Sequence, residues 1–239
     1  MGSGRSSAAP LPAPHSPLPT SGRLALTPRP GKIVCVGRNY RDHAKEMGNE
    51  VPAAPLLFLK PPSAVVASGE AIVLPPASQR VEFEGEIGVV VGATLRRASE
   101  EEAARGVRGL VALNDVTARD LQRSDGQWTR AKGFDTFCPI GPEWVGAPDF
   151  AALTVVTRVN GAERQRGSGA SMVFAVPTLL AYISRVMTLE PGDVVATGTP
   201  AGVGPLAPGD MVEVAVLGGE GSQPLSRVTN LVAAEDARG

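Results

Sequence analysis

Closely spaced acidic side chains are the feature of this sequence with the clearest chemical potential. Glu82, Glu84 and Glu86 alternate along the chain and lead into the apolar run 87–91, which predicts a buried strand. Side chains two residues apart on a strand share one face, about 7 Å apart. Carboxylates that enter a core are costly unless a positive charge neutralises them, and all-oxygen ligands favour Mg²⁺ or Mn²⁺. The alternative is an ordinary solvated strand end.

A third carboxylate is available at Asp115, which follows the apolar stretch 109–113. Three carboxylates would fill about half of an octahedral Mg²⁺ shell and leave positions for water and substrate. Asp115 could equally be the N-cap of a helix that begins near Thr117, which is a common position for aspartate. The spacing alone leaves both interpretations open.

A possible general base comes earlier in the chain. His43 and Glu46 are three residues apart, so on a helix they face the same way. A carboxylate beside a histidine orients the ring and stabilises its charged form. The alternative is a surface histidine with an incidental salt bridge. The other histidine, His15, lies in a Ser- and Pro-rich segment.

Further polar residues could contact a substrate. Lys132 lies among aromatic residues and could stabilise an enolate or a carboxylate, although most lysines are solvated. Arg119 and Gln122 are one helical turn apart and could hold a carboxylate or carbonyl, or only cover the outside of the helix.

A glycine-rich loop follows the apolar stretch 193–197. Its backbone N–H groups and the Thr199 hydroxyl could bind an anion, or the loop could be a plain turn. The Lys-Ser/Thr pair of a nucleotide-binding P-loop is missing, which excludes that class.

Short strands separated by turns must position these residues. Strands are expected at 32–37, 56–59, 64–66, 71–74, 82–91, 107–114, 153–159, 163–165, 193–197, 211–216 and 226–231. Helices are expected at 40–47, 100–105 with Ser99 as N-cap, 118–123 and 176–187. Asn160-Gly161 predicts a type I′ hairpin turn. The pattern is β-rich α+β, with too few helices for alternating βαβ units.

Composition limits the remaining choices. The net charge of −1 gives no reason to expect nucleic acid or an anionic membrane as partner. No apolar run is long enough to span a bilayer. Two distant cysteines suggest neither a disulfide framework nor a zinc site, which favours a reducing cytoplasm. Residues 1–30 are expected to be a flexible low-complexity leader, with a possible edge strand at 24–26, and residues 31–239 a single catalytic domain.

The order of these motifs resembles the fumarylacetoacetate hydrolase family over about residues 32–231. The matching segments are Gly37-Arg38-Asn39-Tyr40-Arg41-Asp42-His43-Ala44-Lys45-Glu46, Leu57-Phe58-Leu59-Lys60-Pro61-Pro62-Ser63, Glu84-Gly85-Glu86-Ile87, Asn114-Asp115-Val116-Thr117-Ala118-Arg119-Asp120-Leu121-Gln122, Lys132-Gly133-Phe134-Asp135-Thr136-Phe137, Leu189-Glu190-Pro191-Gly192-Asp193 and Thr197-Gly198-Thr199-Pro200. Seven motifs in the family's order make chance similarity an inadequate explanation.

The resemblance implies a mixed β-roll of packed sheets around a metal site, usually in a homodimer. It implies Glu84, Glu86 and Asp115 as Mg²⁺ or Mn²⁺ ligands, and His43 with Glu46 as a water-activating dyad on a segment that can close. It also implies Lys132, Arg119, Gln122 and Thr199 as substrate contacts. Glu82 stands where relatives often have Asp or His, so it is left out of the ligand set. The short leader resembles the compact acylpyruvase and 2-hydroxyhepta-2,4-diene-1,7-dioate isomerase branch.

The expected function is a divalent-metal-dependent hydrolase that cleaves a carbon–carbon bond in a 2,4-dioxo acid of the acylpyruvate or fumarylpyruvate type, through a pyruvate enolate. One alternative uses the same site for oxaloacetate decarboxylation or tautomerisation, or for isomerisation and decarboxylation of the heptadienedioate. Another alternative is a non-catalytic, metal-stabilised binding protein, in which Glu84→Gln would unfold the chain. In an enzyme, the same variant should stay folded and lose metal-dependent activity.

Overall fold

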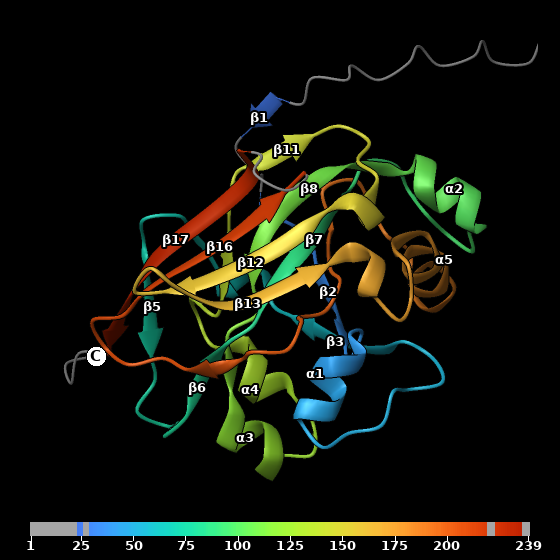
Figure 1. The fold of residues 1–239 in the computed structure, drawn as a ribbon. Coiled ribbons are helices and arrows are strands. Elements are labelled where there is room, and N and C mark those ends of the chain that lie inside the picture. The colour runs from blue at the N-terminus through green and yellow to red at the C-terminus, as the bar shows by residue number, and fades with distance from the viewer. Residues whose placement is uncertain (1–22, 26–28, 219–222, 236–239) are drawn as a thin grey trace, which may run out of the picture.

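The computed structural model describes residues 23–25, 29–218 and 223–235. Over these ranges the architecture is built mainly from a large sheet, and Figure 1 shows its strands β7 and β8 behind a second sheet. In the described residues this large sheet has nine strands, in the order β1 (Arg23–Ala25), β11 (Glu143–Val145), β8 (Val107–Asn114), β7 (Gly85–Val91), β14 (Val194–Ala196), β2 (Ile33–Gly37) and β3 (Leu56–Lys60), while β10 (Cys138–Ile140) joins β8 to β4 (Val65–Ala67).

A second sheet packs across the first one. It contains β13 (Ala162–Ser168), β12 (Thr154–Val159), β16 (Met211–Leu217), β17 (Pro224–Ala234) and β5 (Ala71–Leu74), in that order. A small third sheet joins β15 (Gly204–Pro205), β6 (Val81–Phe83) and β9 (Thr117–Ala118). Most neighbours are antiparallel, but β14 runs parallel to β2, β4 to β10 and β5 to β17, so the sheets are mixed as expected.

The helices are short and lie around the sheets. They are α1 (Arg41–Glu46), α2 (Glu100–Arg105), α3 (Arg119–Ser124), α4 (Thr129–Gly133) and α5 (Val176–Val186), with 3-10 turns η1 (Pro62–Ala64), η2 (Phe150–Ala152) and η3 (Gly169–Ser171). Ser99 caps α2 through a reciprocal capping box with Glu102, which confirms the predicted start of that helix. Asn160 and Gly161 have φ of 52° and 80°, so the predicted hairpin turn between β12 and β13 is also confirmed.

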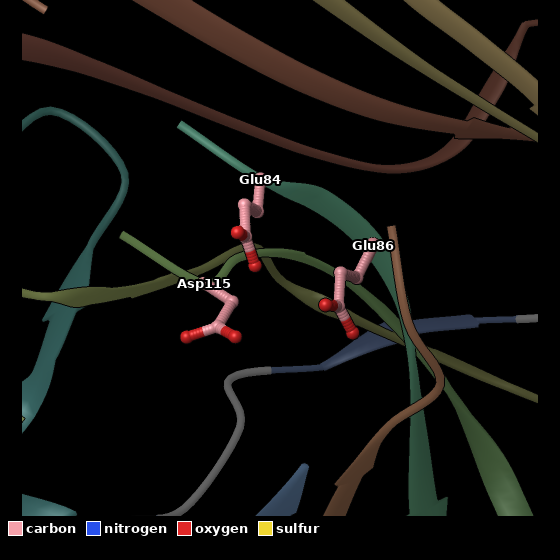
Figure 2. A group of neighbouring side chains, drawn as sticks. All are labelled: Glu84, Glu86 and Asp115. Carbon is pink, nitrogen blue, oxygen red and sulfur yellow. The ribbon is translucent and has the colours of Figure 1, made fainter. Parts of the chain in front are cut away.

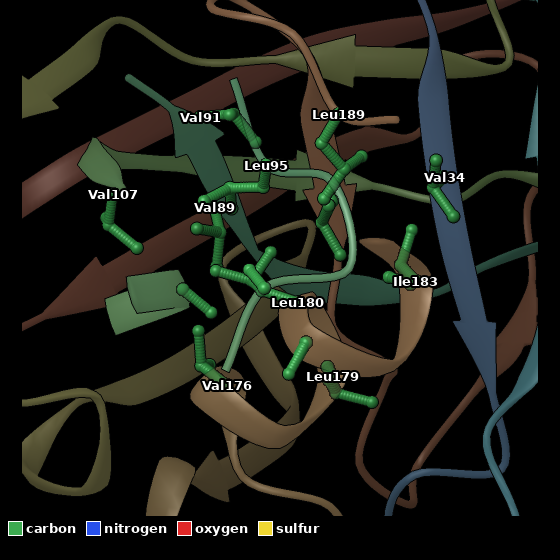
Figure 3. Close-up of a cluster of buried hydrophobic side chains, with 14 of the residues drawn as sticks. Val34, Val89, Val91, Leu95, Val107, Val176, Leu179, Leu180, Ile183 and Leu189 are labelled. Carbon is green, nitrogen blue, oxygen red and sulfur yellow. The ribbon is translucent and has the colours of Figure 1, made fainter. Parts of the chain in front are cut away.

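Two apolar layers hold the large sheet in place. Ile87 and Leu110 pack against Val155 and Val214 of the second sheet. Beyond Ile87, the same face of β7 packs against α5 through Val89 and Val91. Figure 3 shows that α5 presents side chains such as Leu180 toward the sheet. The helix therefore covers the part of the large sheet that the second sheet leaves open.

The large sheet is curled, and its inner side is the face of β7 and β8 that points away from the second sheet and α5. Val90, Val111 and Leu113 belong to an apolar cluster there. Glu86 and Asp115 have the same parity along their strands as Val90 and Leu113, so they extend this inner face toward one end. The alternation of the strands thus carries the carboxylates into the interior.

The predicted continuous strand 82–91 is wrong. The chain bends at Glu84, and β6 and β7 belong to different sheets. The partner chain bends at the same level, since β8 ends at Asn114 and β9 begins at Thr117. Two hydrogen bonds to the backbone of Glu84 hold the bend. The Asp115 N–H donates to the Glu84 carbonyl at 2.8 Å, and the Glu84 N–H donates to Asn114 Oδ1 at 3.0 Å. Apolar periodicity does not reveal a bend stabilised in this way.

The strand β1 pairs with β11 at the edge of the large sheet, as expected for Leu24 and Ala25, while residues 1–22 and 26–28 of the predicted leader lie outside the described residues. Cys35 and Cys138 are both free, in keeping with the prediction that they do not form a disulfide framework, and both are buried. In the described part of the chain, no helix is long and apolar enough to cross a membrane.

Candidate active site

Three buried carboxylates meet at the end of the curled sheet. Glu84 lies in the bend before β7, Glu86 is the second residue of β7, and Asp115 directly follows β8. One ligand atom from each lies within 4.8 Å of the others, and Figure 2 shows the three carboxylates turned toward a common space. All three side chains are buried. The structure therefore brings together the predicted ligand set.

Asp115 is not a helix cap. The helix α3 begins at Arg119, its N-cap residue is Ala118, and no side chain caps it. The N-cap interpretation of Asp115 is therefore wrong. Its carboxylate instead accepts hydrogen bonds from two buried lysines, Lys132 at 2.6 Å and Lys60 at 2.7 Å.

Buried cations balance two of the three carboxylates. The Lys132 ammonium group bridges Asp115 and Glu84, with 2.8 Å to the Glu84 Oε2 atom. Arg119 donates to the other oxygen of Glu84 at 2.5 Å. Burial alone would raise the pKa of Glu84, but Lys132, Arg119 and His43 hold it well below its ordinary value. Glu84 is therefore charged in the folded protein.

Glu86 lacks such compensation. Among the described residues no lysine or arginine forms an ion pair with it, and its hydrogen-bond donor is the Gly198 N–H at 2.7 Å. Burial and the nearby charges of Asp115 and Glu84 raise its pKa well above the ordinary value. This local excess of negative charge, with oxygen ligands on three sides, fits a hard divalent cation such as Mg²⁺ or Mn²⁺.

Glu86 gives a sharper test of cation binding than Glu84. Glu84→Gln would leave Lys132 and Arg119 short of a buried partner, so it would destabilise an enzyme and a binding protein alike. Glu86→Gln removes a carboxylate without breaking an ion pair. We expect the cation-free variant to be at least as stable as the wild type, and to lose the cation's stabilisation, which is about 2.7 kcal/mol at a hundred times Kd.

Urea unfolding with EDTA and with excess Mg²⁺ measures both quantities. Glu100→Gln is the matched control, because it makes the same substitution at an exposed position in the first turn of α2. If Mg²⁺ raised the free energy of unfolding of Glu86→Gln as much as that of the wild type, Glu86 would not be a ligand of the cation.

The predicted histidine–glutamate pair lies beside this cluster. His43 Nδ1 is 3.2 Å from Glu46 Oε2, and the His43 side chain is buried. His43 borders a cavity of about 250 Å³ that Glu84, Glu86 and Asp115 also line. Glu46 is fixed from a second side, since the Gly202 N–H donates to both of its oxygens at 3.0 and 3.2 Å. His43, held by Glu46, therefore shares one cavity with the three carboxylates.

The glycine loop after β14 binds the protein's own carboxylates. Gly198, with φ of 103°, and Gly202, with φ of 102°, donate backbone N–H groups to Glu86 and Glu46. A side chain on Gly198 would also approach Asn39 Cβ to 2.8 Å, so glycine is required there. The loop is thus more than a plain turn, and the anions that it holds belong to the site.

Thr199 lines the cavity, but its hydroxyl already has partners. It donates to the Gly85 carbonyl at 2.9 Å and accepts a hydrogen bond from Gln165 at 2.8 Å. Its predicted contact with substrate stays a prediction, and its observed contacts fix the loop against the start of β7.

Arg119 and Gln122 also line the cavity, one turn apart on α3 as expected. Arg119 donates to Glu82 at 2.7 Å, to Glu84 and to the Gln122 side-chain oxygen. It therefore orients Glu84, and its contact with substrate stays a prediction. Glu82 is also paired with Arg80 and lies outside the three-carboxylate cluster, in keeping with its omission from the ligand set.

Sequence reasoning missed the role of Lys60. This lysine ends β3, is 1% exposed, and donates to Asp115 and to the Val116 carbonyl. The available signal was a charged residue at the end of the apolar stretch 56–59. Two aromatic rings were missed as well: Phe58 lies 4.9 Å from the Lys132 ammonium group and meets Trp128 edge-on at 5.2 Å.

Fold and site together define a class of protein: a β-rich enzyme whose pocket combines carboxylates able to hold a divalent cation with a histidine–glutamate pair. Residues 32–233 match the family described as fumarylacetoacetate (FAA) hydrolase C-terminal. The chain therefore belongs to the fumarylacetoacetate hydrolase family, as its motifs suggested.

Relatives in this family carry out different reactions. The oxaloacetate tautomerase YcgM of Escherichia coli is 43% identical over 192 residues, covering 77% of this chain and 87% of that protein. The 2,4-didehydro-3-deoxy-L-rhamnonate hydrolase of a Sphingomonas species is 42% identical over 199 residues, covering 78% and 70%. The crystal structure of 5-carboxymethyl-2-hydroxymuconate delta-isomerase from Mycobacterium smegmatis has 42% identity and a TM-score of 0.78, covering 90% of this chain and 83% of that one. Family membership therefore leaves the reaction open.

Proposed function

We propose that the protein is a divalent-metal-dependent hydrolase that cleaves a carbon–carbon bond in a 2,4-dioxo acid of the acylpyruvate or fumarylpyruvate type. The observation that carries the proposal is one small cavity that the carboxylate cluster and His43 both line, while Glu46 contacts the His43 ring at 3.2 Å. A hydrolase needs a base beside the electrophile, and the dyad supplies one. A binding protein needs no such pair.

Glu84, Glu86 and Asp115 would hold the cation. When bound, it would supply Lewis-acid stabilisation of the negative charge that develops as the bond breaks. The chain's own groups provide the remaining chemistry. His43 would take a proton from a water molecule that attacks the distal carbonyl, and Glu46 would keep the ring oriented and stabilise its charged form. Lys132, fixed by two carboxylates, would add positive charge near the enolate of the pyruvate product.

Tautomerisation of oxaloacetate is the second candidate, supported by 43% identity to the E. coli tautomerase over most of that protein. This reaction moves a proton between carbon and oxygen through the same kind of enolate, but it consumes no water. Decarboxylation of oxaloacetate and isomerisation of a dienedioate belong with it, since they too need no attacking water. The dyad would then transfer a proton to or from carbon.

A side-by-side assay separates the candidates. Purified protein with Mg²⁺ would receive acetylpyruvate, fumarylpyruvate or oxaloacetate, with cleavage, enol–keto conversion and CO₂ release measured in each. We expect cleavage of an acylpyruvate to have the highest kcat/KM of these reactions, and we expect cleavage to stop when EDTA removes the cation. Rapid oxaloacetate tautomerisation without any cleavage would favour the second candidate.

A further inference from the structure

Two arginines at the cavity have no partner among the residues that the structure describes. Arg38, just before α1, and Arg123, on α3, both line it. In the described residues neither side chain forms an ion pair or a hydrogen bond, whereas Lys132 and Arg119 are fully engaged with carboxylates. A single exposed arginine is ordinary. Two that border one cavity of about 250 Å³ are available to bind an anion inside it.

Burial places this pair at the outer end of the cavity. The carboxylates are buried, while Arg38 is partly exposed and Arg123 is exposed. In Figure 1 the helix α1, which follows Arg38, and the helix α3 lie at the same end of the molecule. Phe58 and Trp128 also line the cavity, so it combines an acidic interior, aromatic rings and a basic opening.

The backbone at Arg38 supports a specific role for its side chain. Its φ is 60°, a left-handed conformation that costs a non-glycine residue free energy. The preceding Gly37 packs against Trp128, and a Cβ there would lie 3.2 Å from that ring. The turn therefore directs the chain past the aromatic rings at the cavity.

We infer that the pocket selects an oxo acid with a second carboxylate, which Arg38 and Arg123 bind at the outer end. This inference rests on the proposed function, in which the oxo-acid end of the substrate lies at the inner cluster. A substrate with an uncharged far end would leave both guanidinium groups without a partner. Among the proposed substrates, the chain therefore favours fumarylpyruvate-like dicarboxylates over acetylpyruvate.

Two near-isosteric probes test this without any reaction. In 2-oxoglutarate a carboxylate stands where 2-oxopentanoate has a methyl group. We expect calorimetry on the Mg²⁺-loaded protein to show at least about tenfold tighter binding of 2-oxoglutarate, the gain of about one charge-assisted contact. In the double variant Arg38→Asn and Arg123→Gln, the two affinities should come within about threefold, mainly through weaker 2-oxoglutarate binding. Asparagine suits the left-handed backbone at position 38.

Arg185→Gln is the matched control, because it removes an exposed arginine of α5 that does not border the cavity, and it should keep the wild-type selectivity. Equal affinity of the wild type for both probes, no binding of either, or an equal loss of both in the double variant overturns the inference. A protein that cleaves acylpyruvates without this selectivity refutes the inference alone. A protein with the selectivity but no cleavage refutes the proposed reaction alone.

Discussion

Replacing His43 by asparagine is expected to lower kcat for acylpyruvate cleavage by about 100- to 10,000-fold, the usual contribution of a positioned general base. His43 lines the cavity, and its contact with the Glu46 carboxylate suits it to proton transfer. It lies outside the cluster of Glu84, Glu86 and Asp115. Cation affinity should therefore change little. Steady-state kinetics measures the first quantity, and calorimetry with Mn²⁺ measures the second.

Asp42→Asn is the matched control for this variant, because it alters the adjacent, exposed residue of α1. It should keep both kcat and cation affinity. A His43→Asn enzyme with full activity would exclude proton transfer by this histidine. A variant that also loses Mn²⁺ would show that His43 supports the metal site rather than the chemistry.

Local rules predicted most of the elements, whereas the resemblance to the family, and not spacing alone, predicted that Glu84, Glu86 and Asp115 form one cluster. The capping box at Ser99 and the Asn160-Gly161 turn are decided by neighbouring residues, so the sequence reveals them. Carboxylates at the ends of adjacent strands meet because strand alternation fixes their face. His43 and Glu46 pair within one helix because residues three apart lie on the same helical face.

Long-range ion pairs could not be predicted in this way. Lys60 and Asp115 are 55 residues apart, and Arg119 and Glu82 are 37 apart. A helical turn placed Arg119 beside Gln122 correctly, but nothing local shows that Glu82 and Glu84 occupy its guanidinium group. The bend at Glu84 could not be predicted either, since it depends on hydrogen bonds with Asn114 and Asp115, which are also distant in the sequence.

These pairs also explain how a core can contain so many charges. Acidic and basic groups alternate from the exposed Arg80 inward, through Glu82, Arg119, Glu84, Lys132 and Asp115 to Lys60. Each buried charge touches at least one of opposite sign, which offsets its loss of hydration. Among the described residues Glu86 stands outside this series, because no lysine or arginine forms an ion pair with it.

Lys60→Met is therefore expected to have the largest effect on stability. The Lys60 and Asp115 side chains are 0% and 1% exposed, and breaking a buried pair costs about 3–5 kcal/mol in free energy of unfolding. Because Lys132 still donates to Asp115, we expect about 3 kcal/mol. Urea unfolding with EDTA present measures this without any contribution from a bound cation.

Lys32→Met is the comparison variant, since it breaks an ion pair with Asp193 in which the lysine is 27% exposed. It should cost only about 1 kcal/mol, because backbone N–H groups of Lys32 and Glu190 still bind that carboxylate. Adding Asp115→Asn to Lys60→Met should recover part of the loss, since it removes the negative charge that Lys60 no longer balances, while Lys132 keeps Glu84 as its partner. If Lys60→Met were no more harmful than Lys32→Met, the alternating buried charges would not be what holds Asp115 in the site.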